Sequence, residues 1–88
     1  MVSEKVYVNA GSGLHLRPAG LLCKKAMEYE CSIRIMTKTA AVNAKSVLSV
    51  LGACIGKGDQ IEIVCDGNRE AEALAAIRKL IEEMDDQT

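Results

Sequence analysis

The residues best suited to chemistry lie in one short stretch, 13–20, which reads Gly-Leu-His-Leu-Arg-Pro-Ala-Gly. It holds the only histidine and the only proline of the chain, His15 and Pro18, with Arg17 between them. A histidine ring near neutral pH has a nitrogen free to attack, and a guanidinium is a forked donor for phosphate. Pro18 fits the first turn of a helix, and a helix start offers free N–H groups to an anion. The pattern predicts a phosphoryl group carried on His15, with Leu16, Arg17 and Pro18 binding the phosphate.

An alternative is that His15 only caps the helix and that Arg17 is an ordinary solvated side chain. The sequence lacks the P-loop of a nucleotide-dependent enzyme. No serine–histidine–acid constellation can be proposed, because the only histidine already belongs to this stretch. The sequence therefore predicts a phosphoryl carrier with no autonomous catalysis, no cofactor and no metal.

A second candidate site begins at Ser46, directly before the apolar run Val-Leu-Ser-Val-Leu. Serine is a favoured N-cap, so a short helix is predicted over 47–53. Its apolar residues Val47, Leu48 and Leu51 cannot all be buried in a small domain, and exposed apolar patches often mark docking surfaces. Ser46 is either a simple cap or a regulatory phosphosite whose charge would act on partners that dock there. Lys45 would offset part of that charge.

Periodicity predicts the elements that position these residues. The first predicted helix starts at residue 16 or 17, and a long helix follows Asn68 or Asp66 as cap. Strands are expected over 2–8, 33–36, 40–43 and 60–65, and residues 9–13 form a flexible loop. The buried stripe of the first helix is Ala19, Leu22, Cys23, Ala26 and Met27. That of the last helix is Ala73, Leu74, Ile77, Leu80, Ile81 and Met84.

This order, βαββαβα, is typical of an α+β fold with an antiparallel four-stranded sheet and its helices on one face. A chain of 88 residues predicts one domain, 1–88. A net charge of −1 argues against direct nucleic-acid binding, and no segment is apolar enough to insert in a membrane. The absence of a leader-like run predicts a cytoplasmic protein. The 4 cysteines form no CxxC pair, so a zinc site is disfavoured and most are expected to be small core residues.

The stretch Gly13–Ala19, together with Val-Asn-Ala-Lys-Ser at 42–46, resembles HPr. This family is the histidine-containing phosphocarrier of the bacterial phosphoenolpyruvate-dependent sugar phosphotransferase system. The resemblance covers essentially the whole chain. It implies an open-faced β-sandwich in which His15 accepts a phosphoryl group through Nδ1 from phospho-enzyme I. His15 would pass that group to the IIA domains of sugar permeases, with Arg17 holding and releasing the phosphate. A small carrier that visits several partners is expected to be a monomer.

The resemblance also implies a role for Ser46. The residues around it resemble those of the Gram-positive branch, in which an ATP-dependent HPr kinase/phosphorylase modifies the matching serine. The modified protein there acts with a LacI-type catabolite regulator in carbon catabolite repression. Val47, Leu48 and Leu51 would match the family's docking surface.

The chain departs from the family's usual pattern near the histidine. Leu16 stands where the family generally has a small residue. Gly20 stands where the family commonly has threonine, serine or alanine. Cys54 replaces a common glycine, and leucines at 48 and 51 replace frequent methionines. Close backbone packing would account for Gly20. The alternative function is therefore a specialised paralogue that works mainly as a regulatory binding module. A purely structural or metal-binding domain ranks last.

Overall fold

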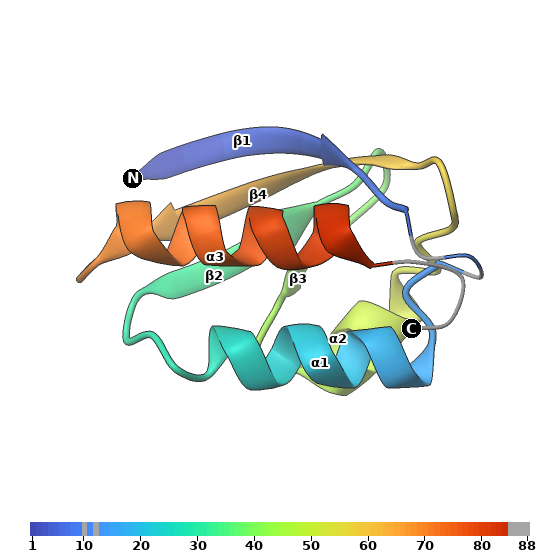
Figure 1. The fold of residues 1–88 in the computed structure, drawn as a ribbon, viewed down its shortest axis with the longest axis horizontal. Coiled ribbons are helices and arrows are strands. Elements are labelled where there is room, and N and C mark those ends of the chain that lie inside the picture. The colour runs from blue at the N-terminus through green and yellow to red at the C-terminus, as the bar shows by residue number, and fades with distance from the viewer. Residues whose placement is uncertain (10, 12, 85–88) are drawn as a thin grey trace.

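The computed structural model describes residues 1–9, 11 and 13–84. The predicted element order is confirmed (Figure 1). The elements are β1 (Val2–Tyr7), α1 (Leu16–Ala26), β2 (Ser32–Met36), β3 (Ala41–Asn43), α2 (Val47–Gly52), β4 (Gln60–Asp66) and α3 (Glu70–Glu83). Part of the predicted loop 9–13, namely residues 10 and 12, lies outside the described residues. Along the described part of the chain, no helix is long and apolar enough to cross a membrane.

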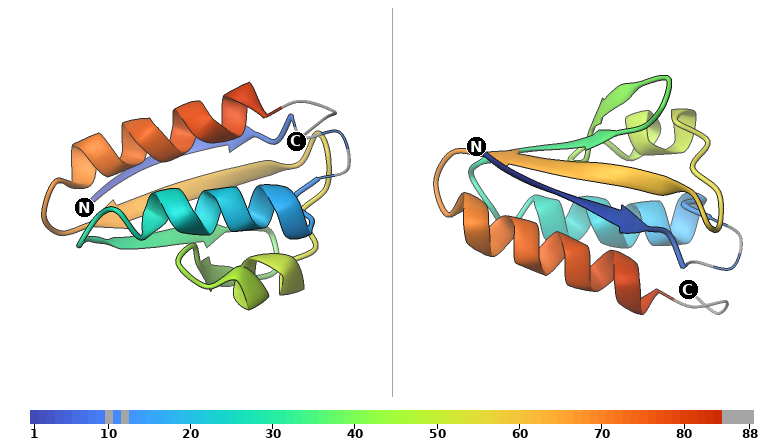
Figure 2. Two further views of the ribbon diagram at one scale, coloured as in Figure 1. Left: turned by 60° about the horizontal axis from the view of Figure 1, so that its bottom comes forward. Right: turned by 90° about the horizontal axis from the view of Figure 1, so that it is seen from above.

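The four strands form one antiparallel sheet in the order β1-β4-β2-β3, so β1 and β3 are its edges. Helices α1 and α3 lie side by side across one face of the sheet, and α2 packs against α1 and β3 (Figure 2). No helix of the described residues covers the other face of the sheet. The predicted α+β class with an open-faced sheet is therefore confirmed.

The alternation of each strand explains which face the helices cover. Ile35 pairs with Ile63 across the β2–β4 ladder, and both side chains are fully buried. Arg34, one residue earlier, pairs with Val64 on the open face. Because successive strand residues point to opposite faces, one face supplies the apolar floor of the core and the other faces solvent. The helices contribute to this core Ala19, Leu22, Ala26, Ala73, Ile77 and Ile81.

Two details of the helix predictions were wrong. Met27 was expected in the buried stripe of α1, but it is the C-cap residue and is 65% exposed, since the helix ends at Ala26. The N-cap of α3 is neither Asn68 nor Asp66 but Arg69, which adopts the left-handed conformation with φ 57°. The helix start is stabilised from inside instead, because the Glu70 carboxylate accepts the Gly67 N–H at 3.0 Å.

Candidate functional site

His15 is the N-cap residue of α1, with extended backbone (φ −82°, ψ −166°) and an exposed side chain. Its ring makes no capping hydrogen bond. Within the described part of the chain, neither the His15 ring nor the Arg17 guanidinium has a hydrogen-bond or ion-pair partner. The interpretation of His15 as a mere side-chain cap is therefore wrong. The backbone of His15 holds the ring at the helix start, and no hydrogen bond or ion pair to the described residues restrains it.

The segment before His15 is fixed by backbone contacts. The Leu14 N–H donates to the Ile55 carbonyl at 2.9 Å, and the Leu14 side chain is buried. Gly13 has φ +77°, and a Cβ there would lie 2.3 Å from the Ile55 oxygen and 2.7 Å from the Gly56 Cα. Only glycine fits this conformation and this approach. Gly13 is thus buried and does not clear space for a partner, which the sequence alone did not reveal.

The segment after His15 forms the first turn of α1. Pro18 is buried and has no N–H, and the Ala19 N–H already donates to the His15 carbonyl at 2.9 Å. The amides of Leu16 and Arg17 are therefore the free donors of the first turn. No acidic residue lies in that turn, so the positive end of the helix dipole stays available to an anion.

Leu16 and Gly20 lie one helical turn apart beside His15. Leu16 is 69% exposed and places an apolar side chain next to the ring. A Cβ at Gly20 would meet no atom within 4 Å. Close backbone packing therefore does not explain Gly20, and that expectation was wrong. The surface of α1 therefore carries an exposed leucine and, one turn later, a glycine with free space around it.

Ser46 is the N-cap of α2, as predicted. Its Oγ accepts the Ser49 N–H at 3.2 Å, and the residue is half-buried. Its capping role is confirmed, while its role as a phosphosite stays a prediction.

The residue before Ser46 ties α2 to α1. The Lys45 ammonium donates to the Tyr29 carbonyl at 2.6 Å. The Cys23 thiol of α1 donates to the Lys45 carbonyl at 3.0 Å. The Lys45 ammonium is thus engaged just beyond the end of α1, and its effect on a phosphate at Ser46 stays a prediction.

The predicted docking residues differ in exposure. Leu48 is 82% exposed, whereas Val47 and Leu51 are only partly exposed and pack against the core. Leu48 on α2 and Leu16 on α1 are thus the two most exposed leucines of helices that pack on each other.

The 4 cysteines have different surroundings and all are free thiols. Cys31 and Cys65 are buried, as expected of small core residues, and burial raises the pKa of the Cys65 thiol to about 11. Cys54 is exposed and has φ +52°, which explains why glycine suits this position. Cys54 is therefore not one of the core cysteines. Among the described residues, no cluster of three or more metal-binding side chains occurs.

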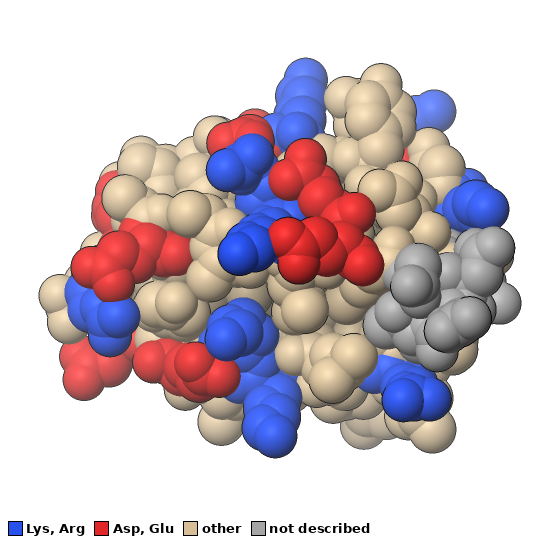
Figure 3. All heavy atoms as spheres, in the orientation of Figure 1, with Lys and Arg blue, Asp and Glu red and all other residues tan. Residues whose placement is uncertain are grey.

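Acidic and basic side chains are interspersed on the face that carries α3 (Figure 3). Arg78 lies within 3.2 Å of the Glu4 carboxylate and 3.5 Å of that of Glu82. Mixed charges of this kind form no basic stripe for a nucleic acid.

Comparison with known proteins gives one consistent family. Residues 2–83 match the family model PTS-HPr, described as the PTS HPr component phosphorylation site. The phosphocarrier protein HPr of Treponema pallidum is 37% identical over 82 residues, which cover 93% of each chain. The HPr-like protein Crh of Halalkalibacterium halodurans is also 37% identical over 82 residues, covering 93% of this chain and 98% of that protein.

Solved structures agree with these relatives. The crystal structure of an HPr from Bacillus anthracis superposes with a TM-score of 0.87 at 34% identity, covering 91% of this chain and 95% of that one. The structure of Bacillus subtilis Crh, described as a dimer with a swapped domain, gives a TM-score of 0.77 at 28% identity, covering 96% and 97%. With an exposed histidine at the N-cap of α1 and a family model matched over residues 2–83, the chain belongs to the HPr family of phosphocarrier proteins.

Proposed function

We propose that His15 accepts a phosphoryl group from phospho-enzyme I of a sugar phosphotransferase system and passes it to IIA domains. The observation that carries this proposal is the His15 ring, exposed and without a partner at the start of α1. In the transfer, a new bond forms between a ring nitrogen (Nδ1 in the family) and phosphorus. The bond between phosphorus and the donor protein's side chain breaks, and its electron pair stays on the donor.

The surroundings of His15 suit reversible transfer. The free amides of Leu16 and Arg17 and the Arg17 guanidinium can all donate to the phosphoryl oxygens, so the added negative charge is met at the helix start. Arg17 itself is exposed and unpaired. It can move with the phosphoryl group as the partner changes, which favours release as well as binding.

The direct test is incubation with enzyme I and labelled phosphoenolpyruvate. An acid-labile phosphoryl group should appear on the protein, and His15→Ala should abolish it. Arg17→Met should slow transfer, whereas Arg34→Met, which removes an exposed cation on the open face of the sheet, should leave the rate unchanged. Absence of label with an enzyme I that phosphorylates another HPr would contradict the proposal.

We further propose that Ser46 is a regulatory phosphosite, read by proteins that dock on Leu48 and Leu16. The half-buried Ser46 hydroxyl caps α2 directly before Val47 and Leu48. A phosphate there would add about two negative charges beside this apolar surface. Phosphorylation by an ATP-dependent HPr kinase, lost in Ser46→Ala and retained in Ser49→Ala, tests the assignment. Phosphorylation of Ser49 in its place would contradict it.

The similarity to Crh supports a second candidate function, a regulatory module that binds a LacI-type catabolite regulator through Ser46 and α2. His15 favours the carrier role, since a purely regulatory protein has no need of it. The two functions separate in one experiment. Enzyme I labels a carrier at His15, while a purely regulatory module binds the regulator after Ser46 modification and takes no label.

We propose a monomer in solution, since one exposed site must reach several partners. Light scattering coupled to size exclusion tests this, and a stable dimer of the kind described for Crh would contradict it.

A further inference from the structure

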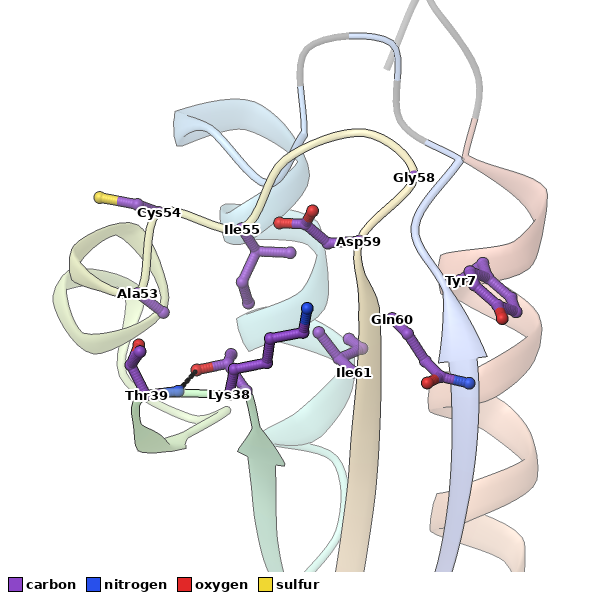
Figure 4. A pocket seen from close by; sticks show the side chains of 11 residues that line it. Tyr7, Lys38, Thr39, Ala53, Cys54, Ile55, Gly58, Asp59, Gln60 and Ile61 are labelled. Atoms are coloured by element: carbon purple, nitrogen blue, oxygen red, sulfur yellow. Dashed lines mark hydrogen bonds between the residues drawn. The ribbon is translucent and has the colours of Figure 1, made fainter.

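A hollow that is not lined by His15 lies at one end of the sheet. It has a volume of about 560 Å³ and opens between the β2–β3 turn and the segment that joins α2 to β4 (Figure 4). A smaller hollow of about 250 Å³ adjoins it on the open face of the sheet, since the two share Thr37, Lys38, Gln60 and Ile61. Together they form one groove, called here the Lys38 groove. Its larger part is within the range of small-molecule sites.

The side chains of this groove suit a particular kind of ligand. Ile55 and Ile61 are buried and form an apolar floor. Lys38 extends over that floor, while Tyr7 and Gln60 lie on the side opposite Thr39 and Cys54 (Figure 4). A floor of branched aliphatic groups beneath a cation and several hydrogen-bonding groups matches a molecule with an apolar body and an oxyanion.

The Lys38 ammonium is the group of this groove that an anion could pair with. The Lys38 ammonium has no hydrogen-bond or ion-pair partner among the described residues. The one carboxylate that lines the larger hollow, Asp59, already accepts the Gly56 N–H at 2.8 Å. Lys5 and Glu62, which line the smaller hollow, are cross-strand partners of opposite charge. Lys38 is the lysine that lines both hollows, and a carboxylate or phosphate is the group that would satisfy its ammonium.

One wall of the groove also holds the His15 segment in place. Ile55 lines the groove, and its carbonyl accepts the Leu14 N–H at 2.9 Å. In the same segment the Gly58 N–H donates to the Val8 carbonyl at 2.8 Å, and the Val8 N–H donates to the Asp59 carbonyl at 3.0 Å. A molecule resting on Ile55 and Asp59 would therefore act on the backbone that positions His15.

We propose that the Lys38 groove binds a small organic anion and that the bound anion alters phosphoryl transfer at His15 through Ile55. The oxyanion pairs with the Lys38 ammonium, and the apolar body lies on Ile55 and Ile61. The second half of this proposal rests on the proposed phosphocarrier function. The binding half does not.

Binding is tested with phenyl phosphate as probe, followed by the amide shifts of the ¹⁵N-labelled protein. Saturable shifts should gather at residues 37–39 and 53–61, with a dissociation constant on the order of 1 mM, as suits a shallow site and a small probe. Lys38→Met should weaken binding by about tenfold or more. Lys79→Met, which removes an exposed lysine of α3, should leave it unchanged. Benzyl alcohol, which lacks the charge, should bind more weakly.

Cys54 supplies an independent readout, because it is the exposed thiol and lies at the rim of the groove. In a Cys23→Ala background, bound phenyl phosphate should slow alkylation of Cys54 by iodoacetamide, and Lys38→Met should remove the protection. Shifts spread evenly over surface lysines and arginines, shifts confined to His15 and Arg17, or equal affinity of the Lys38→Met variant would overturn the proposed site.

The effect on His15 is measured as the rate of phosphorylation by enzyme I with and without saturating probe. We expect a change of about fivefold or more that disappears in Lys38→Met. An equal effect of the probe on the native protein and on Lys38→Met would show that the probe acts on enzyme I and would overturn the coupling. A chain that takes no label at all contradicts the phosphocarrier function, whereas the shift experiment still decides the binding site.

Discussion

His15 and Ser46 occupy the same position, the N-cap, in two helices that pack on each other, yet their side chains are used in opposite ways. The Ser46 hydroxyl accepts a backbone N–H of its helix, and the neighbouring Lys45 and Cys23 tie that region to α1. The His15 ring has no such contact, and only its backbone and its buried neighbours hold it. The proposed phosphoryl acceptor is thereby kept apart from the hydrogen bonds that hold the fold. Modification of Ser46, in contrast, would change a group that the fold already uses.

The largest effect should come from the backbone that holds His15. Gly13→Ala should lower the free energy of unfolding by about 3 kcal/mol or more, because its Cβ would collide with the Ile55 carbonyl and φ is positive. Phosphoryl transfer should fall as well, since the segment must shift. Urea unfolding and the labelling rate measure the two effects. Gly20→Ala is the matched control on the other side of His15, where the same methyl group meets nothing. Equal destabilisation by both changes would contradict the role given to Gly13.

The contacts around Ser46 should rank next. Lys45→Met should lower the free energy of unfolding by about 1–2 kcal/mol, because the Tyr29 carbonyl loses a part-buried, charge-assisted donor. Lys24→Met removes an exposed lysine of α1 and should change the free energy of unfolding by less than about 0.5 kcal/mol. Urea unfolding of both variants decides the matter. If the two cost the same, the tie between α2 and α1 contributes nothing to stability.

The two N-caps can be compared directly. Ser46→Ala should cost about 1 kcal/mol of stability, because the Ser49 N–H loses its acceptor. His15→Ala should cost less than about 0.5 kcal/mol, because no contact of the ring is lost. Thermal unfolding of both variants at one pH tests the difference. A larger loss for His15→Ala would show that the ring has a structural role after all.

The smallest effect has the opposite sign. Gly20→Ala should raise the free energy of unfolding by about 0.5–1 kcal/mol, because alanine restricts the unfolded chain and favours the helix where space is open. Transfer from enzyme I should continue, and the rate to each IIA domain shows whether a partner uses the space beside Leu16. Destabilisation by Gly20→Ala would mean that α1 is strained there in a way that the contacts do not reveal.

Much of this molecule follows from local sequence patterns. Apolar residues at every second position, such as Ile33 and Ile35 or Ile61 and Ile63, predicted the strands. Pro18 predicted where α1 begins. The capping preference of serine located α2 correctly. These features depend on residues within a few positions of each other, so propensity and periodicity suffice. The cap of α3 was missed because Arg69 takes a left-handed conformation, for which arginine has no local preference.

Only the tertiary structure decided what depends on residues far apart in the chain. Gly13 has to be glycine because Ile55 and Gly56 approach it, and Lys45 is engaged because the end of α1 lies beside it. The Lys38 groove exists because the β2–β3 turn and the segment before β4 meet at one end of the sheet. The residue types at 13–18 determined the chemistry that His15 can perform. The fold decided that its ring has no structural contact, because that follows from which surfaces pack together and which stay in solvent.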